Sequence, residues 1–578
     1  MFSDARAVPS GRIIESEVCV IGSGPAGIAI ARELAKAGRS VLLLESGGID
    51  PDPDIQKLSV GENAGLPYFP LDECRVRGFS GSALGWEIAV GNSLTGARYA
   101  PLDDIDFERR DAVPYSGWPF SRSHLLPYYE LAQEMLGLGP FTYRVQDWMD
   151  AQGTPPLPVE RDVLETTIFQ FNTGDQFTTT YKNELAGSEL IAVLHHATVV
   201  SIDTDEAGGS VQKVEAATLT GNRFAVSARV FVLAAGGIEN ARLLLVSNQV
   251  HQNGLGNSSD LVGRFFMEHP HFVTGILVPD DTSMLSRPAY SDVHVIDGVP
   301  VQRMLKMTQG ILRRERMLNY VFRLTPVPWN DGFRHLALQP PQADGVDSLR
   351  ALAIALGRDR RLPPNAARHV RNLFKDIDDL ARAGLAPLRW ALRSWSRGGS
   401  PVPPDGTPAL YQLNVMAEQA PNPESRVTLS DRVDALGMRL LDPRCRQVRL
   451  DWRLSDVDIR TLSRAREIVG QQLAISDLGK VRMRYLRDGL PSPMWGGNHH
   501  MGTTRMHADA RYGVVDAHCK VHGVANLYVA GSSVFPTSGC VNPTLTIVAL
   551  ALRLAEHINR DTGRRLEVAP EAADPNPA

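Results

Sequence analysis

Residues 17–38 read EVCVIGSGPAGIAIARELAKAG, and SVLLLE follows at 40–45. The apolar run before Gly22 predicts a buried parallel strand, and the segment after the glycines predicts a helix that ends at Gly38. SVLLLE predicts a second strand, which closes at Glu45, 18 residues after Gly27. This order of strand, glycine turn, helix, strand and terminal acid is typical of a doubly wound dinucleotide-binding unit.

The glycine turn has the GxGxxG spacing, and each glycine has its own expected task. Gly22 allows the tight turn, Gly24 lets the backbone approach a pyrophosphate, and Gly27 lets the helix pack closely on its strand. The helix that begins at Pro25 and Ala26 offers free N–H groups to the phosphate. Glu45 is placed to accept both ribose hydroxyls, which disfavours NADP. By analogy at the level of the fold, the position near residue 20 and the length favour FAD over NAD.

Two later stretches repeat the strand, glycine turn and helix. ARVFVLAA at 228–235 is followed by Gly236 and a Leu-rich helix, and a strand at Leu527–Ala530 is followed by Gly531. Pro543 lies near the start of the last helix, where proline is favoured. Between the first two units, residues 190–205 and 211–221 show an antiparallel hairpin pattern. The two ends of the chain are therefore expected in one nucleotide domain, and the middle of the chain in another.

Composition sets the broad class. The chain has 578 residues, 43% of them hydrophobic and 22% charged, with a net charge of −5. These values predict a folded protein of three or four domains and no attraction to nucleic acid. Five cysteines without a CxxC pair predict reduced thiols, and the first twelve residues lack a signal peptide's pattern, so a cytoplasmic location is expected. The sequence contains no run of about 18 apolar residues, so no transmembrane helix is expected.

Five stretches resemble the GMC (glucose–methanol–choline) family of flavoprotein oxidoreductases. They are GSGPAGIAIARELAKAG (22–38), AAGGIENARLLL (234–245), LVGRFFMEHPH (261–271), EQAPNPESRVTLSDRVDALGM (418–438) and GVVDAHCKVHGVANLYVAGSSVFPTSGCVNPTLTIVALALRLA (513–555). The likeness is closest to the bacterial sugar and polyol dehydrogenase branch, with fructose and gluconate dehydrogenases and pyranose oxidases. Some members of that branch oxidise hydroxyls of aminoglycoside intermediates.

The resemblance implies an α/β FAD-binding Rossmann-like domain and an α+β substrate domain with an antiparallel sheet, the arrangement also called p-hydroxybenzoate hydroxylase-like. The FAD domain is expected to join residues 1–270 and 495–578, with part of 65–190 capping the flavin. Residues 271–494 are expected to form the substrate domain. From the motifs and the resemblance together, the expected cofactor-binding residues are Gly22, Gly24, Pro25, Ala26, Gly27, Glu45, Ser46, Gly81, Ser82, Val199, Ala235, Gly236, Asn240, Gly531, Ser532, Pro543 and Thr544.

The resemblance also implies a catalytic pair, a His followed by an Asn or His. NHHMGTTRM at 498–506 places the first member at His499, and the partner before Pro543 is Asn542. His500 is the adjacent alternative. His499 would take the hydroxyl proton of an alcohol while a hydride passes to flavin N5, and Asn542 would orient the hydroxyl. No metal is expected. His269 in MEHPH is interpreted as a structural histidine.

One segment departs from the family pattern. The flavin-facing loop, which usually reads GGTSNHW in this branch, is SGSALGW at 80–86. Pyranose oxidases with covalent flavin use a His just before that Trp, and Gly85 stands there instead. FAD is therefore expected to bind non-covalently. The stretch from residue 87 to residue 100 is also longer than the link that usually joins this loop to the following PLD in the family.

The leading hypothesis is an FAD-dependent dehydrogenase or oxidase acting on a CH–OH group of a sugar, aminosugar or polyol. A lyase or isomerase that keeps FAD on the same fold, the oxidation of a non-sugar alcohol and a non-catalytic flavoprotein stay open. The electron acceptor is oxygen, a quinone or a redox protein, and an oligomer is possible. Residues 340–404 match no shared motif. The stretch from Arg350 to Arg397 carries a net charge of +7 and is expected to be a helical insertion near the substrate.

Overall fold

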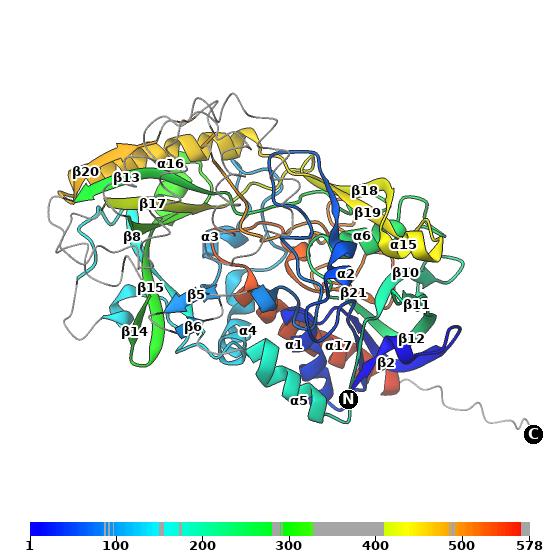
Figure 1. The fold of residues 1–578 in the computed structure, drawn as a ribbon. Coiled ribbons are helices and arrows are strands. Elements are labelled where there is room, and N and C mark those ends of the chain that lie inside the picture. Colours follow the sequence, from blue (N-terminus) through cyan, green and yellow to red (C-terminus); the bar gives the residue numbers. More distant parts are fainter. Residues whose placement is uncertain are drawn as a thin grey trace, which may run out of the picture.

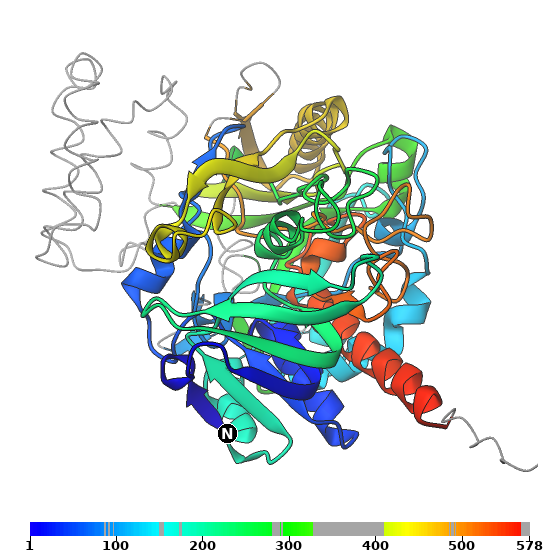
Figure 2. The same cartoon turned by 90° about the vertical axis from the view of Figure 1, so that its right-hand side faces the viewer.

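The computed structural model describes residues 1–85, 88–90, 93–95, 97–149, 155–172, 176–279, 290, 293–327, 410–484, 486, 490–491 and 493–567. The basic insertion predicted at 340–404 lies outside the described residues, as does Trp86 of the flavin-facing loop. The described chain is organised around two large β-sheets (Figures 1 and 2).

The first sheet is mainly parallel and confirms the predicted nucleotide-binding architecture. Its strand order is β1 (Phe2–Asp4), β9 (Ile191–His195), β3 (Val41–Leu44), β2 (Ile13–Ile21), β12 (Arg223–Leu233), β11 (Val211–Ala217) and β10 (Thr198–Thr204). Strands β1, β9, β3, β2 and β12 run parallel to one another. Strands β11 and β10 continue the sheet beyond β12 as antiparallel strands.

Strand β12 joins the two ends of the chain. Along one edge it pairs with β2, whereas its opposite edge pairs first with β11 and then with β21 (Leu527–Val529). The long helix α17 (Thr544–Glu567) packs against α1 (Pro25–Lys36) and α4 (Arg122–Met135). Figure 1 shows α17 (red) beside α1 (blue). The prediction that both termini build one domain core is thus met by strand pairing and by helix packing.

The hairpin predicted from residues 190 to 221 is correct only in its second part. Strands β10 and β11 form an antiparallel pair, but residues 191–195 form β9, which is parallel to β1 and β3. Strand β9 ends just before His196, which adopts a positive φ of 58°, and β10 begins after it. Because a left-handed residue reverses the strand direction locally, one apolar run becomes two strands with different partners.

The second sheet is antiparallel throughout. Its order is β20 (Gly479–Met483), β13 (His271–Pro279), β17 (Leu410–Ala417), β16 (Tyr320–Val327), β15 (Val299–Met307), β8 (Leu164–Phe171) and β7 (Arg98–Tyr99), with β14 (His294–Ile296) paired to β15. Helix α16 (Asp456–Ile475) packs along β20. Strands β7 and β8 come from the N-terminal third of the chain, so the second sheet also combines distant segments.

Smaller elements connect the two sheets. A three-stranded sheet contains β18 (Arg426–Val433), β19 (Arg446–Asp451) and β4 (Gly61–Asn63), and β5 (Ile88–Val90) pairs with β6 (Ser93–Thr95). The shorter α-helices are α2 (Pro53–Gln56), α3 (Asp104–Phe107), α5 (Tyr181–Gly187), α6 (Glu239–Val246), α9 (Gln309–Glu315) and α15 (Ala435–Leu440). The 3₁₀ turns are η1 (Ala5–Ala7), η2 (Lys57–Ser59), η3 (Gly81–Gly85), η4 (Val145–Trp148) and η7 (Ser532–Val534), and Gln176–Thr180 forms a π-helical turn. Within the described ranges, no helix has the length and apolar character needed to span a membrane.

Candidate active site

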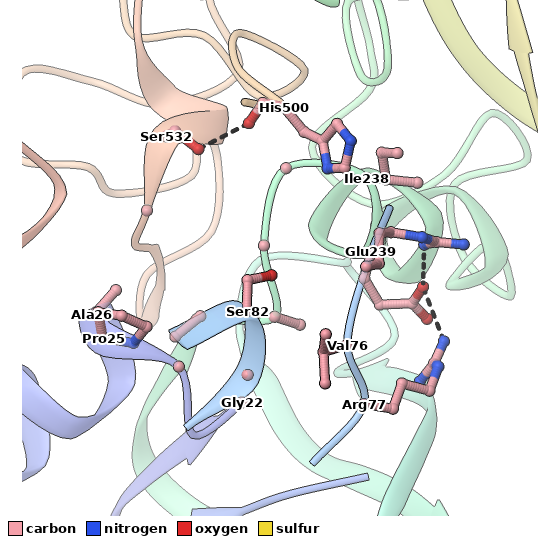
Figure 3. A pocket seen from close by; sticks show the side chains of 18 of the residues that line it. Gly22, Pro25, Ala26, Val76, Arg77, Ser82, Ile238, Glu239, His500 and Ser532 are labelled. Carbon is pink, nitrogen blue, oxygen red and sulfur yellow. Dashed lines mark hydrogen bonds and ion pairs between the residues drawn. The ribbon is translucent and has the colours of Figure 1, made fainter. Parts of the chain in front are cut away.

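A cavity of about 540 Å³ opens at the carboxyl ends of β2, β3 and β12. In open α/β sheets this edge is where ligands bind. The cavity continues to the loops around residues 497–500 and 542–544, and Figure 3 shows the part between the glycine turn and His500. A single cavity thus connects the predicted nucleotide turn with the predicted catalytic pair.

Nearly all the residues predicted from the sequence line this cavity. They are Gly22, Gly24, Pro25, Ala26, Glu45, Ser46, Gly81, Ser82, Val199, Ala235, Gly236, Gly531, Ser532, Pro543, Thr544, His499, His500 and Asn542. Gly27 and Asn240 do not line it. A Cβ on Gly27 would lie 1.9 Å from the Gly22 oxygen, so Gly27 serves the close packing of α1. Asn240 accepts a hydrogen bond from Ala235 N at 2.9 Å and donates to Ala530 O at 3.1 Å, which ties two cavity loops together.

The end of the cavity at β3 suits a ribose. Glu45 accepts hydrogen bonds from Ser23 N (3.1 Å), from Ser23 Oγ (2.6 Å) and from Gly47 N (2.8 Å). Burial raises the pKa of Glu45 despite these three bonds. Each carboxylate oxygen has a further lone pair, so the group can also accept ribose hydroxyls. Glu45 is therefore held by the chain and directed at the cavity.

The glycine turn suits a pyrophosphate. Gly22 has a φ of +105°, and a Cβ there would lie 2.5 Å from Ala234 O, so a side chain is excluded. By contrast, a Cβ on Gly24, Gly236 or Gly531 would have no described atom within 4 Å, and all three residues face the cavity. This open backbone beside the first amides of α1 matches the needs of a dinucleotide phosphate. The residues present therefore fit FAD, which the fold implies.

Three arginines surround Glu239 at the side of the cavity, and the motifs did not predict this cluster. Arg75 and Arg77 lie 3.3 Å and 3.1 Å from a Glu239 oxygen, and Arg242 lies 2.5 Å from the other. Figure 3 shows Arg77 beside Glu239. Burial alone would raise the pKa of Glu239, but the three guanidinium groups lower it. The carboxylate therefore stays charged and fixes Arg75 and Arg77 in the cavity wall.

At the opposite end, His499 and Asn542 form a hydrogen-bonded pair. Asn542 Nδ2 lies 3.1 Å from His499 Nε2, and Asn542 Oδ1 accepts from Arg98 Nε at 2.9 Å. On its other side, His499 Nδ1 lies 2.8 Å from His269 Nδ1, and His269 Nε2 lies 3.2 Å from the Ser538 carbonyl oxygen. The predicted pair therefore belongs to a longer chain of hydrogen bonds.

This chain fixes the tautomer of His499. A carbonyl oxygen only accepts, so His269 Nε2 carries the proton that it donates to Ser538. Burial lowers the pKa of His269 to about 4, so its ring is neutral at pH 7 and its Nδ1 accepts. His499 Nδ1 must then be the donor. Burial and the nearby His269, His271 and Arg98 lower the pKa of His499 as well, which leaves an unprotonated Nε2 facing the cavity.

A buried carboxylate shapes the loop that carries His499. Glu268 accepts hydrogen bonds from the backbone N–H groups of His269 (3.0 Å), Gly497 (2.6 Å) and His499, and from the Tyr68 hydroxyl (2.8 Å). Burial raises the pKa of Glu268 to about 7. Because three of these donors are backbone amides, two of them in the loop that carries His499, Glu268 holds the backbone of that loop in place.

His500 has a different environment. Its Nε2 lies 3.0 Å from the Tyr68 hydroxyl, and its backbone oxygen accepts from Ser532 Oγ at 2.7 Å. Burial lowers the pKa of His500 to about 3. No hydrogen bond joins its ring to Asn542 in the described part of the chain. The geometry therefore brings His499, and not His500, against Asn542.

Several residues of this end were not identified from the sequence. Arg98, Tyr68 and Glu268 lie outside any motif with a fixed spacing, and His269 was interpreted as structural. The MEHPH stretch, in which an acid is followed by two histidines with a proline between them, was the one available signal. The five cysteines are buried and free, as expected.

Comparison with known proteins agrees with this geometry. Residues 421–551 match the family model of GMC oxidoreductases, and residues 20–49 match that of NAD(P)-binding Rossmann-like domains. The chain is 23% identical to a 2-methyl-1,2-propanediol dehydrogenase from Mycolicibacterium austroafricanum, over 94% of this chain and 95% of that protein. It is also 23% identical to a 6'''-hydroxyparomomycin C oxidase from Streptomyces lividus, over 94% and 92% of the two chains.

Among solved structures, pyridoxine 4-oxidase from Mesorbium loti shares the fold, with a TM-score of 0.50 and 16% identity over 94% of this chain and 99% of that one. The C-terminal family match covers the loop that holds His499 and the turn that holds Asn542, and the full-length relatives cover both sheets. The C-terminal part of the chain, residues 421–551, therefore matches the GMC oxidoreductases, and the whole chain is similar to the two relatives named.

Proposed function

We propose that this protein oxidises a CH–OH group of a polyol or sugar-like alcohol, with His499 as the base. The observation that carries this proposal is the unprotonated Nε2 of His499, which faces the cavity beside the Asn542 amide. The relatives named above, a diol dehydrogenase and a hydroxyparomomycin oxidase, support an alcohol as substrate. When bound, FAD supplies the acceptor for the hydride that leaves the alcohol carbon.

The residues of the chain handle the proton. An alcohol hydroxyl that displaces the hydrogen bond between Asn542 Nδ2 and His499 Nε2 would donate its proton to the imidazole and accept a hydrogen bond from the amide. Because Arg98 holds Asn542 Oδ1, the amide keeps its N–H groups directed at the substrate. The charge that develops on the substrate oxygen then meets an oriented donor, with the Arg98 guanidinium behind it.

We further propose that FAD binds without a covalent bond. Gly85 stands at the position of the linking histidine, lines the cavity and offers no nucleophile. Acid precipitation should therefore release all of the flavin into the supernatant. Flavin that stays on the precipitated chain would contradict this.

The domain division and the location are part of the same proposal. Residues 1–270 and 495–578 would form the FAD domain, with part of 65–190 over the flavin, and 271–494 the substrate domain. The odd, sparse set of buried thiols supports a reducing, cytoplasmic location. Limited proteolysis with and without FAD would test the division, since the flavin should protect the first domain selectively.

The deciding experiment is anaerobic flavin reduction with a panel of polyols, sugars and their hydroxy-acid counterparts. In His499→Ala, FAD should stay bound while reduction slows by about 10²- to 10⁴-fold. His500→Ala is the matched control, because its ring faces Tyr68 instead of Asn542, and its reduction rate should fall far less. A larger loss in His500→Ala would show that the base is misassigned. Steady turnover without any bleaching of the flavin would favour a lyase.

A further inference from the structure

Arg98 stands out among the groups that line the cavity. Strand β7 carries it into the cavity wall, where its Nε donates to Asn542 Oδ1 at 2.9 Å. Its Nη2 lies 3.7 Å from Met416 Sδ, and its guanidinium carbon lies 5.8 Å from the centre of the Phe169 ring. Among the described residues, no carboxylate pairs with this guanidinium, which is largely buried. Nη1 and the second N–H of Nη2, which donates its other hydrogen only to Met416 Sδ, are therefore available to a ligand.

Several other buried arginines of the described chain are paired with carboxylates, although Arg553 contacts His124 and the Ala517 oxygen, outside the cavity. Arg75 and Arg242 contact Glu239, and Arg110 contacts Glu418 through both of its terminal nitrogens. Arg505 also lacks a carboxylate among the described residues, but it lies 4.5 Å over the Phe265 ring and outside the cavity. Burying a cation without a counter-charge is costly, so an unpaired one in a binding cavity points to a charge that the ligand brings.

The acids closest to the catalytic loop are already engaged. Glu268 accepts from three backbone amides and from Tyr68, and Glu418 binds Arg110. Burial is the main cause that lowers the pKa of Arg98, and a nearby second cation, Arg323 of β16, lowers it further. The pKa of Arg98 falls to about 9, so the guanidinium still carries its charge at neutral pH. The Arg98 guanidinium at this end of the cavity therefore has no carboxylate partner among the described residues.

We propose that Arg98 binds a carboxylate of the substrate, so that the enzyme acts on hydroxy acids rather than on neutral alcohols or aminosugars. This inference rests on the proposed function and narrows its substrate class. The terminal nitrogens of an arginine form a planar fork that matches a carboxylate in two parallel hydrogen bonds. An aminosugar would instead place a second cation against Arg98.

The geometry also limits the distance between the two groups of the substrate. Asn542 Nδ2 lies 3.1 Å from His499 Nε2, and Asn542 Oδ1 accepts a hydrogen bond from Arg98 Nε at 2.9 Å. One amide group thus separates the base from the anion-binding group. A hydroxyl at His499 and a carboxylate at Arg98 must then be only a few bonds apart, as they are in 2-hydroxy acids and in sugar acids.

The test compares matched pairs that differ in a carboxylate, propane-1,2-diol with lactate and D-glucose with D-glucuronate. Anaerobic flavin reduction is measured for the wild-type holoenzyme, Arg98→Met and Arg98→Lys. The acid of at least one pair should be preferred in the wild type, and Arg98→Met should reduce that preference by about 10- to 100-fold. Arg98→Lys should retain part of it. The ratio within a pair is the readout, because the loss of the bond to Asn542 slows both members.

A preference for the neutral members, or an unchanged ratio in Arg98→Met, would overturn the proposal. An altered spectrum of the reduced flavin with an unchanged ratio would show that Arg98 faces the cofactor, which also overturns it. If no alcohol or acid reduces the flavin, the proposed function is wrong. A separate binding measurement then still shows whether Arg98 binds a carboxylate.

The binding test is a titration of the oxidised holoenzyme with acetate and with acetamide, followed by flavin absorbance. Acetate should give a saturable spectral change, and its neutral isostere acetamide should not. This comparison needs no variant, so it holds even if Arg98→Met does not fold. Equal responses to acetate and acetamide would overturn the carboxylate site. Loss of the acetate response in Arg98→Met would assign it to this residue.

Discussion

His269 Nδ1 lies 2.8 Å from His499 Nδ1, and one of these nitrogens must donate to the other. Because His269 gives its own proton to the Ser538 carbonyl, it is the acceptor of this pair. His269 therefore fixes the orientation and tautomer of His499, the base in the proposed function.

Replacing His269 should slow catalysis without removing the cofactor. In His269→Phe, the ring of His499 loses its acceptor and can expose a protonated Nε2 to the substrate. Flavin reduction should slow by about 10- to 10³-fold, since a base in the wrong tautomer is strongly impaired. The matched control is His271→Phe, because His271 lies 6.2 Å from His499 by ring centres and makes no hydrogen bond to it in the described structure. Equal losses in the two variants would contradict a positioning role for His269.

The pH dependence of reduction follows from the environment of His499. Burial, His269, His271, Arg98 and His500 all lower its pKa below the ordinary value of 6.5. The active form is the neutral imidazole, which is present above the pKa. The rate should therefore stay level as the pH falls through 6.5 and decline only at lower pH. In Arg98→Met the loss of a nearby cation raises the pKa of His499, so the acid limb should move to higher pH.

Stopped-flow reduction between pH 4.5 and 8.5 measures both profiles. A wild-type rate that halves near pH 6.5 would show that the imidazole is solvated as in a free histidine, contrary to the burial described here.

Glu45 should determine much of the affinity for FAD. In Glu45→Gln, the amide nitrogen meets the N–H groups that the carboxylate now accepts, and the bonds to the ribose weaken. The dissociation constant of FAD should rise by about 10- to 100-fold. Glu33→Gln on the outer face of α1 is the control, since Glu33 pairs with Lys36 at the surface. Fluorescence titration of the apoprotein measures both, and an equal affinity for the two variants would exclude Glu45 as the ribose ligand.

Gly237 should tolerate no side chain. A Cβ there would lie 2.1 Å from the backbone oxygen of His500, which is adjacent to His499 in the chain. Gly237→Ala must displace that loop, so stability should fall by about 1–3 kcal/mol and reduction should slow. Gly209→Ala is the control, because a Cβ on Gly209 meets no described atom within 4 Å. Thermal denaturation together with flavin reduction separates the two effects, and a Gly237→Ala protein as stable and active as Gly209→Ala would refute the clash.

The parts of the site that the sequence predicts are those set by local structure. Gly22, Gly24 and Glu45 sit at fixed distances along one strand–turn–helix–strand unit, and such spacing directly reports the backbone path. The part of the hairpin prediction that was wrong also relied on a local pattern. The alternation of apolar residues within one stretch does not show which strand that stretch will pair with. A single left-handed residue, His196, redirected β9 into the parallel sheet.

The groups around the catalytic pair depend on contacts between distant segments. Arg98 and Asn542 are 444 residues apart, and Tyr68 and His500 are 432 residues apart. Neither Arg98 nor Tyr68 belongs to a periodic element that would fix its direction. Their roles follow only once the second sheet brings β7 to the cavity and Glu268 holds the catalytic loop.

The double pairing of β12 has a consequence for synthesis. A ribosome makes β2 and β12 within the first 233 residues, but β21 and α17 emerge only after residue 527. Until then, half of one edge of β12 is bare, the face of α1 that receives α17 is uncovered, and the cavity lacks the wall formed by Asn542, Pro543 and Thr544. The nascent chain therefore carries an open nucleotide fold through most of its translation, a state prone to aggregation. Cofactor capture becomes a late event, and the yield of active protein should depend on chaperones and on flavin supply at the moment of release.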